Sequence, residues 1–283
     1  MPVEIEGDRL RGPAVFDMKG GLTQIIVALR ILRRLGLEPD LTPTILINSD
    51  EEIGSPESEP AIREAAKASN RVFITEPSLG LEGRVKTGRK GWGRFTLTVT
   101  GKASHAGLDP EGGVSAIEEL GHLVQALHAM TDLGRGLTVN VGVVSGGTRP
   151  NVIAAEALAE VDVRVLTGAD EKEMEARIRG LQPTLPGAGL RVDGGFLVPP
   201  LERTPRNRAL WDSAVDAAHD LGLELEEGVA GGGSDGNTTS QHTATLDGIG
   251  AVGDGAHAPH EFLFVEKHVE RCALLARLLL LAP

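Results

Sequence analysis

Residues 44–55 read Thr-Ile-Leu-Ile-Asn-Ser-Asp-Glu-Glu-Ile-Gly-Ser, a run of apolar β-formers that ends in three consecutive carboxylates and a glycine turn. A buried strand that ends in Asp50, Glu51 and Glu52 needs a positive charge nearby, and a metal ion is the simplest candidate. Adjacent side chains point in different directions, so one glutamate can bind the ion while the other transfers protons. The alternative is a solvated acidic turn in which Asp50 or Ser55 caps the next helix.

Three further segments place a carboxylate or a histidine near the end of an apolar run, beside Gly or Pro. They contain Asp17 in Val-Phe-Asp-Met-Lys-Gly-Gly, Glu76 in Phe-Ile-Thr-Glu-Pro, and His257 in Gly-Asp-Gly-Ala-His-Ala-Pro. Residues that follow parallel strands gather at the carboxyl edge of an α/β sheet, where such folds bind ligands. The sequence therefore predicts that these residues share one site with Glu51 and Glu52.

The first part of the chain has the periodicity of a parallel α/β fold. Apolar residues recur at helical spacing from Leu22 to Leu32, and Gly36 is expected to end that helix. Buried strands are predicted at 44–47 and 72–75, with a helix at 57–69 between them.

From Trp92 onward the pattern changes to that of strands with one solvent-exposed face. The predicted order is a strand from Trp92, a helix at 114–127, strands at 137–144 and 156–165, a helix at 170–181 and a strand at 190–196. This β-α-β-β-α-β order is that of a ferredoxin-like unit. A helix at 207–222 and a short buried strand at 249–252 return to the first pattern. We therefore predict an α/β fold whose α/β/α metal-binding domain, 1–87 and 203–283, has a mostly parallel sheet and receives the inserted domain 88–202.

Composition and charge exclude several classes of protein. The 283 residues exceed the size at which one core usually stops growing, and 41% hydrophobic with 24% charged residues argue against disorder. The net charge is −12, and the 28 basic residues are scattered, which argues against a nucleic-acid surface. The apolar tail 274–282 is too short to span a bilayer and is interrupted by Arg277. The single cysteine excludes an internal disulfide, and no signal peptide opens the chain, so we predict a cytoplasmic protein.

The motifs together resemble the zinc-dependent family of glutamate carboxypeptidases, aminoacylases, acetylornithine deacetylases and succinyl-diaminopimelate desuccinylases, above all its bacterial glutamate carboxypeptidase branch. They occur in the family's order over essentially all 283 residues. The matching segments are Asp17–Gly21, Asp50–Ser55, Glu76–Pro77, Gly101–Gly107, Asn151–Ile153, Asp162–Arg164, Gly231–Asp235 and His257 with Glu261.

The resemblance implies a two-zinc hydrolase centre. Asp17 would bridge two zinc ions, Glu52 and His257 would complete one site, and Glu76 would belong to the other. Glu51 would be the general base that deprotonates the water between the metals and then protonates the leaving nitrogen. The resemblance also implies a cis peptide bond between Asp17 and Met18. The activity implied is hydrolysis of an amide bond next to a free carboxylate, by a carboxypeptidase or an N-acyl amino acid deacylase.

Further residues would bind the substrate and connect two subunits. By resemblance, Asn151 and Arg164 hold the substrate carboxylate, and Gly233 and Ser234 of the glycine-rich loop also contact the substrate. His105 would reach across a homodimer, formed through the inserted lid domain, to stabilise the oxyanion. The implied partners are thus a small N-acyl amino acid or peptide and a second copy of the chain, with no nucleic acid and no membrane.

One feature departs from the family. Its first zinc ligand is a histidine of a His-x-Asp pair upstream of the segment that matches Asp17, whereas here no histidine precedes His105 and no His-x-Asp occurs. We therefore expect an amino-terminally truncated relative, one ligand short at the site of Asp17 and Glu76. The alternatives to the two-zinc hydrolase are an inactive truncated relative and a one-metal protein that keep the fold and dimer surface. The sequence leaves open whether the chain binds two ions, one or none, and whether the ion is Zn²⁺, Co²⁺ or Mn²⁺.

Overall fold

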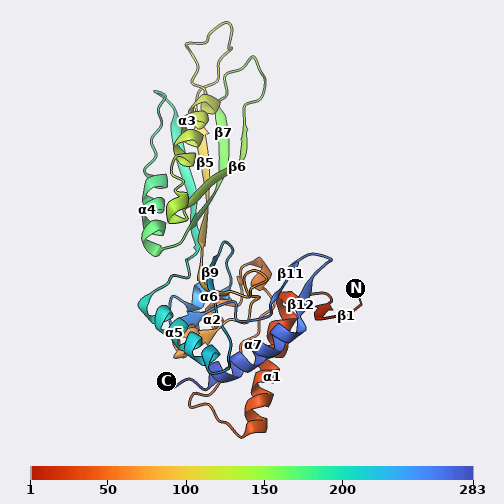
Figure 1. Ribbon diagram of the computed structural model, residues 1–283. Helices are drawn as coiled ribbons and strands as arrows, with labels where there is room; N and C mark the ends of the chain where they lie inside the picture. The colour runs from red at the N-terminus through yellow and green to blue at the C-terminus, as the bar shows by residue number, and fades with distance from the viewer. Residues whose placement is uncertain (1, 283) are drawn as a thin grey trace. The chain divides into compact units, whose positions relative to one another are not determined.

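The computed structural model describes residues 2–282, which divide into two compact units (Figure 1). The first unit comprises the described residues up to Arg89 together with those from Leu201 onward. The second unit is Lys90–Pro200, a single continuous stretch of the chain.

The second unit is one antiparallel sheet with two helices. Its elements are β5 (Gly91–Thr100), α3 (Ala116–His128), a 3-10 turn (Leu133–Arg135), β6 (Thr138–Gly146), β7 (Glu156–Val165), α4 (Gly168–Arg179) and β8 (Gly189–Val198). The strands lie in the order β6-β7-β5-β8, and each neighbouring pair is antiparallel. The predicted ferredoxin-like order is confirmed.

The core of the second unit follows from the alternation of its strands. Phe95 and Leu97 of β5 are buried, whereas Thr96 between them is only partly covered. The buried residues pack in one cluster with Leu123 of α3 and Ile178 of α4. Because one cluster includes both helices, α3 and α4 cover the same face of the sheet.

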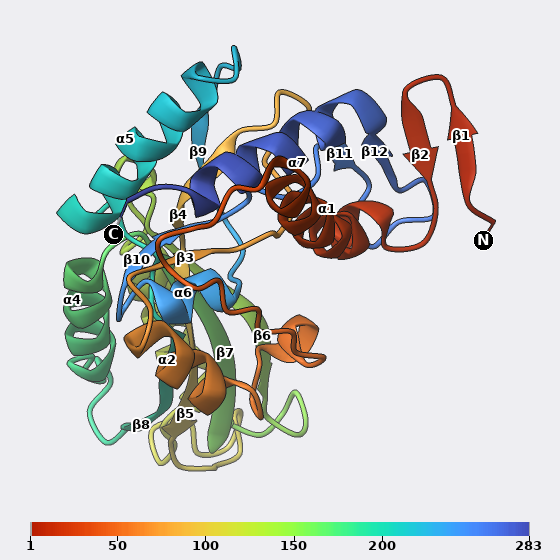
Figure 2. The same ribbon diagram turned by 90° about the horizontal axis from the view of Figure 1, so that it is seen from below.

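The helices of the first unit surround a second core. They are α1 (Gly20–Leu35), α2 (Glu59–Lys67), α5 (Pro205–His219), α6 (Asp235–Thr239) and α7 (Val265–Leu279), with a π turn at Val15–Lys19 and a 3-10 turn at Glu51–Ile53. Figure 2 shows α1 and α7 side by side, and Leu32 of α1 shares a cluster with Leu274 of α7 and Trp211 of α5. Helix α1 ends as predicted at Gly36, whose φ of 66° is left-handed. No helix in residues 2–282 is long and apolar enough to cross a membrane.

The strands of the first unit form three small sheets. They are β1 (Glu4–Glu6), β2 (Arg9–Arg11), β3 (Arg71–Phe73), β4 (Val85–Arg89), β9 (Glu227–Ala230), β10 (Ala244–Leu246), β11 (Gly253–Asp254) and β12 (Phe262–Phe264). The pairs β3–β10 and β4–β9 are parallel, while β1-β2-β12-β11 is antiparallel. The α/β class is confirmed, and the antiparallel sheet differs from the mostly parallel arrangement that we predicted.

Two predicted strands are wrong. Residues 44–47 are irregular, and Ile45 and Ile47 are 47% and 68% exposed. A strand requires a partner, and within the described chain residues 38–49 form no backbone–backbone hydrogen bond. Residues 249–252 are buried but irregular, because Ile249 and Gly250 donate singly to the carbonyls of Ile74 and Glu76 without continuing as a regular ladder.

Candidate metal centre

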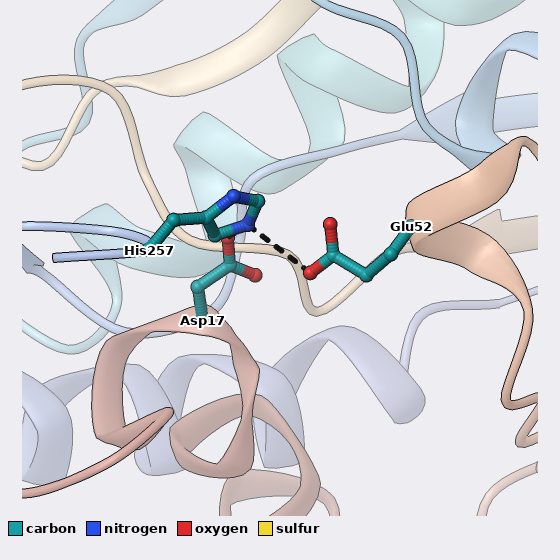
Figure 3. A group of neighbouring side chains, drawn as sticks. All are labelled: Asp17, Glu52 and His257. Atoms are coloured by element: carbon teal, nitrogen blue, oxygen red, sulfur yellow. Dashed lines mark hydrogen bonds and ion pairs between the residues drawn. The ribbon is translucent and has the colours of Figure 1, made fainter.

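Asp17, Glu52 and His257 converge in the first unit (Figure 3). His257 Nε2 lies 3.1 Å from Glu52 Oε1 and 3.2 Å from Asp17 Oδ2. One ligand atom from each residue falls within 4.8 Å of the others. Two carboxylate oxygens and an imidazole nitrogen are donors that divalent zinc accepts, so the group fits a metal ion.

The loop that carries Asp17 is fixed by a buried carboxylate, Glu261. Its Oε2 accepts a hydrogen bond from Ala14 N at 2.7 Å, and its Oε1 accepts from Phe16 N at 2.9 Å and Asp17 N at 2.8 Å. Glu261 ends the turn that contains His257, so it connects two of the three donors. The Asp17–Met18 peptide bond is cis, as the resemblance implied.

A glycine brings the start of α1 against the segment that precedes Glu76. A Cβ atom at Gly21 would lie 2.0 Å from the carbonyl oxygen of Thr75, a distance that no side chain tolerates. Glycine at this position therefore allows the start of α1 to approach the backbone of Thr75, the residue before Glu76. Glu76 is not one of the three converging donors, but its charge and that of Asp17 interact.

The three acidic residues of the 50–52 turn have different environments. Asp50 Oδ2 accepts hydrogen bonds from Glu57 N at 2.9 Å and Ser58 N at 3.0 Å, and its Oδ1 accepts from Ser58 Oγ. Asp50 therefore holds the turn at residues 57 and 58 that leads into α2, whereas the N-cap residue of α2 itself is Ser58 and no side chain caps the helix. Glu52 remains available to the metal group and Glu51 is half-buried beside it.

Burial and mutual repulsion perturb the carboxylates of the centre. Burial, followed by the charges of Asp235 and Glu52, raises the pKa of Glu51 to about 7. Burial, followed by the charge of Asp247, raises the pKa of Glu76, and burial with the charge of Glu52 raises that of Asp17. A cation bound among them would oppose each shift, since a nearby positive charge favours the ionised form.

The glycine-rich loop is held by a buried ion pair. Arg89 Nε and Nη2 donate to Asp247 at 2.7 and 3.1 Å, while Arg89 Nη1 donates to the carbonyls of Gly232 and Gly233 at 3.1 and 2.9 Å. Ser234 Oγ donates to Asp247 Oδ2 at 2.5 Å. One cation and one anion therefore fix the loop that precedes α6.

The remaining predicted residues lie in the second unit. His105 is exposed, and its Nδ1 accepts hydrogen bonds from Gly107 N at 3.2 Å and Leu108 N at 3.1 Å, which leaves Nε2 as the protonated nitrogen. Arg164 binds Asp162 through two hydrogen bonds of 2.9 and 3.2 Å, and Asn151 lies exposed in a turn.

The chain matches known peptidases in sequence. Residues 87–183 match the peptidase dimerisation domain of the M20 family. Over 286 aligned residues the chain is 31% identical to carboxypeptidase G2 of a Pseudomonas species, covering 99% of this chain and 68% of that protein. The chain belongs to the M20 family of peptidases. The resemblance seen in its motifs is confirmed, and its named relatives are hydrolases.

Solved structures share the fold of this M20 chain. Aminopeptidase PepT from Bacillus cereus superposes with a TM-score of 0.80 and 22% identity, covering 98% of this chain and 75% of that one. A dinuclear metal binding peptidase of the M20 family from Bacillus subtilis has a TM-score of 0.67 and 20% identity, covering 91% and 69%. At sequence identities of 22% and 20%, the similarity to these two structures establishes the fold of the M20 chain and nothing further.

Three supporting residues of this M20 chain, Arg89, Asp247 and Glu261, have no role that was predicted from the sequence. Asp247 follows the apolar strand β10 and precedes a glycine, the same signal that singled out the other carboxylates. Glu261 belongs to the matching segment that contains His257, whereas Arg89 carries no comparable local signal. Their contacts join residues 158 and 244 positions apart in the chain.

Proposed function

We propose that this chain hydrolyses an amide bond next to a free carboxylate, as a metallo-carboxypeptidase or an N-acyl amino acid deacylase. The observation that carries the proposal is the convergence of Asp17, Glu52 and His257, with Glu51 in the same turn. Membership of the M20 family and the similarity to a carboxypeptidase support it. The domain with the metal residues, 1–87 and 203–283, would perform the chemistry, and 88–202 would serve as lid and dimer surface.

Asp17, Glu52 and His257 would hold one Zn²⁺, and Asp17 with Glu76 would belong to a second ion. A bound divalent cation polarises a carbonyl and lowers the pKa of water. The three-donor group favours one complete site, because Glu76 stands outside it. A one-metal protein is therefore the second candidate.

The protein's own residues would handle protons and orientation. Glu51 is half-buried and adjacent to a proposed ligand, so it would accept a proton from the attacking water and return it to the leaving nitrogen. Arg164 and Asn151 would hold the substrate carboxylate, and Gly233 with Ser234 would contact the substrate. Arg164 suits that task because its planar fork grips a carboxylate through two bonds.

Metal content and turnover test the proposal together. We expect the purified chain to bind Zn²⁺ stoichiometrically and to hydrolyse N-acetylglutamate or glycylglutamate in a manner abolished by a chelator and restored by metal. The matched substrate amidated at the α-carboxylate should react far more slowly. Two ions per chain would favour the two-zinc enzyme, one ion without turnover would favour the one-metal protein, and no bound ion would refute both.

Removing the carboxylate of Glu261 should weaken metal binding. Glu261→Ala takes three acceptor contacts from the loop that carries Asp17, and loss of such supporting groups typically costs about 10- to 100-fold in metal affinity. Calorimetric titration with Zn²⁺ measures this change. Glu266→Ala, at an exposed position of α7, is the matched control. Equal affinities in the two variants would show that the Glu261 contacts are dispensable.

Assembly can be tested through His105. We propose a homodimer formed through the second unit, in which His105 of one subunit would donate Nε2–H to the oxyanion at the other subunit's centre. If the single chain is active, mixing His105→Ala with Glu51→Ala subunits should restore partial activity, because one site of the mixed dimer keeps both groups. A monomer by light scattering, or no recovery despite demonstrated subunit exchange, would contradict the arrangement.

A further inference from the structure

Helix α6 begins with a carboxylate, Asp235, that binds the segment carrying Glu51 and Glu52. Its Oδ1 accepts a hydrogen bond from Ser55 Oγ at 2.5 Å, and its Oδ2 accepts from Asn48 Nδ2 at 3.0 Å. Asn48 Nδ2 also donates to Ser55 Oγ at 3.1 Å, so the three side chains contact one another in pairs. We call Asn48, Ser55 and Asp235 the clamp. It joins both ends of the segment in which Glu51 and Glu52 lie.

One end of that segment has a backbone conformation that needs support. Ser55 is 4% exposed, and its φ of 53° lies in the left-handed region that residues other than glycine rarely adopt. Its N–H donates to Asp50 O at 2.9 Å, which closes the turn around Glu51 and Glu52. Such a conformation persists only where the surrounding contacts enforce it. The hydrogen bond from the Ser55 hydroxyl to Asp235 is one of these contacts.

Asp235 is itself held in place from the other side. Ser234, the residue before it, donates through Oγ to Asp247 Oδ2 at 2.5 Å and accepts from Gly236 N at 3.0 Å. Asp247 is paired in turn with Arg89. The start of α6 is therefore fixed to the buried ion pair independently of the clamp, and Asp235 connects that fixed point to the turn of the metal centre.

The charge of Asp235 lies where it costs stability. Burial raises the pKa of Asp235 above its ordinary value, the hydrogen bonds from Ser55 and Asn48 oppose this shift, and the charges of Asp50 and Asp247 add to it. A carboxyl group whose pKa is raised by folding destabilises the fold at neutral pH. If Asp235 only supported the fold, a neutral side chain of the same shape would serve as well or better. Ionisable groups kept at such a cost are typical of functional sites.

We propose that Asp235 is a positioning residue of the metal centre, which through Asn48 and Ser55 holds Glu52 toward the metal ion and Glu51 toward the reacting water. This role rests on the proposed function. A misplacement of about 1 Å can lower turnover about 100-fold. Loss of a supporting contact typically lowers metal affinity about 10- to 100-fold. Because the clamp holds the turn rather than the substrate, its loss should lower kcat and leave KM nearly unchanged.

Zn²⁺ titration, urea unfolding and kinetics on the same variants test this role. Asp235→Ala removes both acceptors, whereas Asp235→Asn keeps the shape and can still donate to Ser55 Oγ and accept from Asn48. We expect Asp235→Ala to lower Zn²⁺ affinity about 10- to 100-fold, with Asp235→Asn between it and the unmodified chain. At saturating Zn²⁺, kcat for N-acetylglutamate should follow the same order while KM stays nearly constant. With a chelator present, the urea midpoint of Asp235→Asn should equal or exceed that of the unmodified chain.

A further variant keeps the test decisive if Asp235→Ala does not fold. Ser55→Gly removes the hydroxyl, but glycine adopts the left-handed conformation without strain, so this variant should fold and still bind Zn²⁺ more weakly. Hydrogen exchange at the Ser55 amide, measured with a chelator, should accelerate in Asp235→Asn. Asp216→Asn makes the same change of charge at an exposed position of α5 and is the matched control for all these measurements.

The outcomes separate this role from the proposed hydrolysis. Zn²⁺ affinity, kcat and Ser55 exchange that match the Asp216→Asn control would overturn the role of Asp235 and leave the hydrolysis intact. A urea midpoint that falls in both Asp235 variants with the chelator present would show a structural residue and also overturn it. No Zn²⁺ bound by the unmodified chain would refute the proposed function and, with it, this role. Zn²⁺ affinity and amide exchange require no turnover, so they decide the role even in a chain without activity.

Discussion

We expect Arg89→Leu to lower the free energy of unfolding of the first unit by about 3–5 kcal/mol, the usual cost of leaving one member of a buried ion pair alone. Arg89 and Asp247 have side-chain exposures of 5% and 0%. The substitution leaves the Asp247 carboxylate with fewer partners in a nearly dry environment. It also removes the two hydrogen bonds that hold the carbonyls of Gly232 and Gly233.

Urea unfolding followed by tryptophan fluorescence measures this loss. A Trp92→Phe background leaves Trp211 as the reporter, since these are the two tryptophans and Trp211 is buried in the first unit. The matched control is Arg277→Leu, which breaks an ion pair with Asp220 whose side chains are 35% and 54% exposed. Such surface pairs contribute about 0–1 kcal/mol. A loss no larger than that of the control would show that the buried pair is not important for stability.

The same variant has a defined pH dependence. Burial opposes ionisation of Asp247, but the charges of Arg89 and Lys86 outweigh it and hold its pKa below the ordinary value. The stabilisation is therefore full above the pKa of an unfolded aspartate, about 3.9, and is lost as pH falls through the lower folded pKa. Arg89→Leu removes the charge with the larger effect, so its loss of stability should be nearly constant from pH 7 to about pH 4 and should shrink as the pH falls below about 3.9. A loss in the free energy of unfolding that grows as the pH falls would contradict this prediction.

We expect substitutions of Glu51 and Glu52 to have different effects, one on turnover and the other on metal content. If Glu51 is the general base and Glu52 a ligand, Glu51→Gln keeps the metal and lowers kcat by about 100- to 10,000-fold. Glu52→Gln instead reduces the bound metal. The physical basis is that adjacent side chains point in different directions, and the structure places Glu52 but not Glu51 in the three-donor group.

Metal analysis and single-turnover kinetics on the same preparations distinguish the two roles. Glu57→Gln is the matched control, because Glu57 is an exposed residue of the same loop whose backbone N–H, not its carboxylate, contacts Asp50. Equal loss of metal in Glu51→Gln and Glu52→Gln, with the fold intact, would reject the division of roles. Retention of metal and full kcat in Glu51→Gln would reject Glu51 as the base.

The local sequence pattern was sufficient to predict a helix or strand when the residues that specify the element lie within it. The alternation around Phe95 and Leu97 predicted a half-buried strand, and the glycine at 36 predicted the end of α1. The stretch 44–47 has equally strong β-forming residues, yet it is irregular. A strand is stabilised by hydrogen bonds to a neighbouring strand, and its own residues do not specify which segment that neighbour is.

The family, the α/β class and the candidate donors could be predicted from sequence, because Asp17, Glu52 and His257 lie in short motifs whose chemistry can be interpreted locally. The groups that support these donors became apparent only in the folded chain. Asp50 holds the turn before α2 while Glu52 contacts His257, Glu261 fixes the loop of Asp17, and Arg89 pairs with Asp247. These contacts join residues up to 247 positions apart. These contacts depend on burial and on interatomic distances in the folded chain. The spacing of residues along the sequence specifies neither.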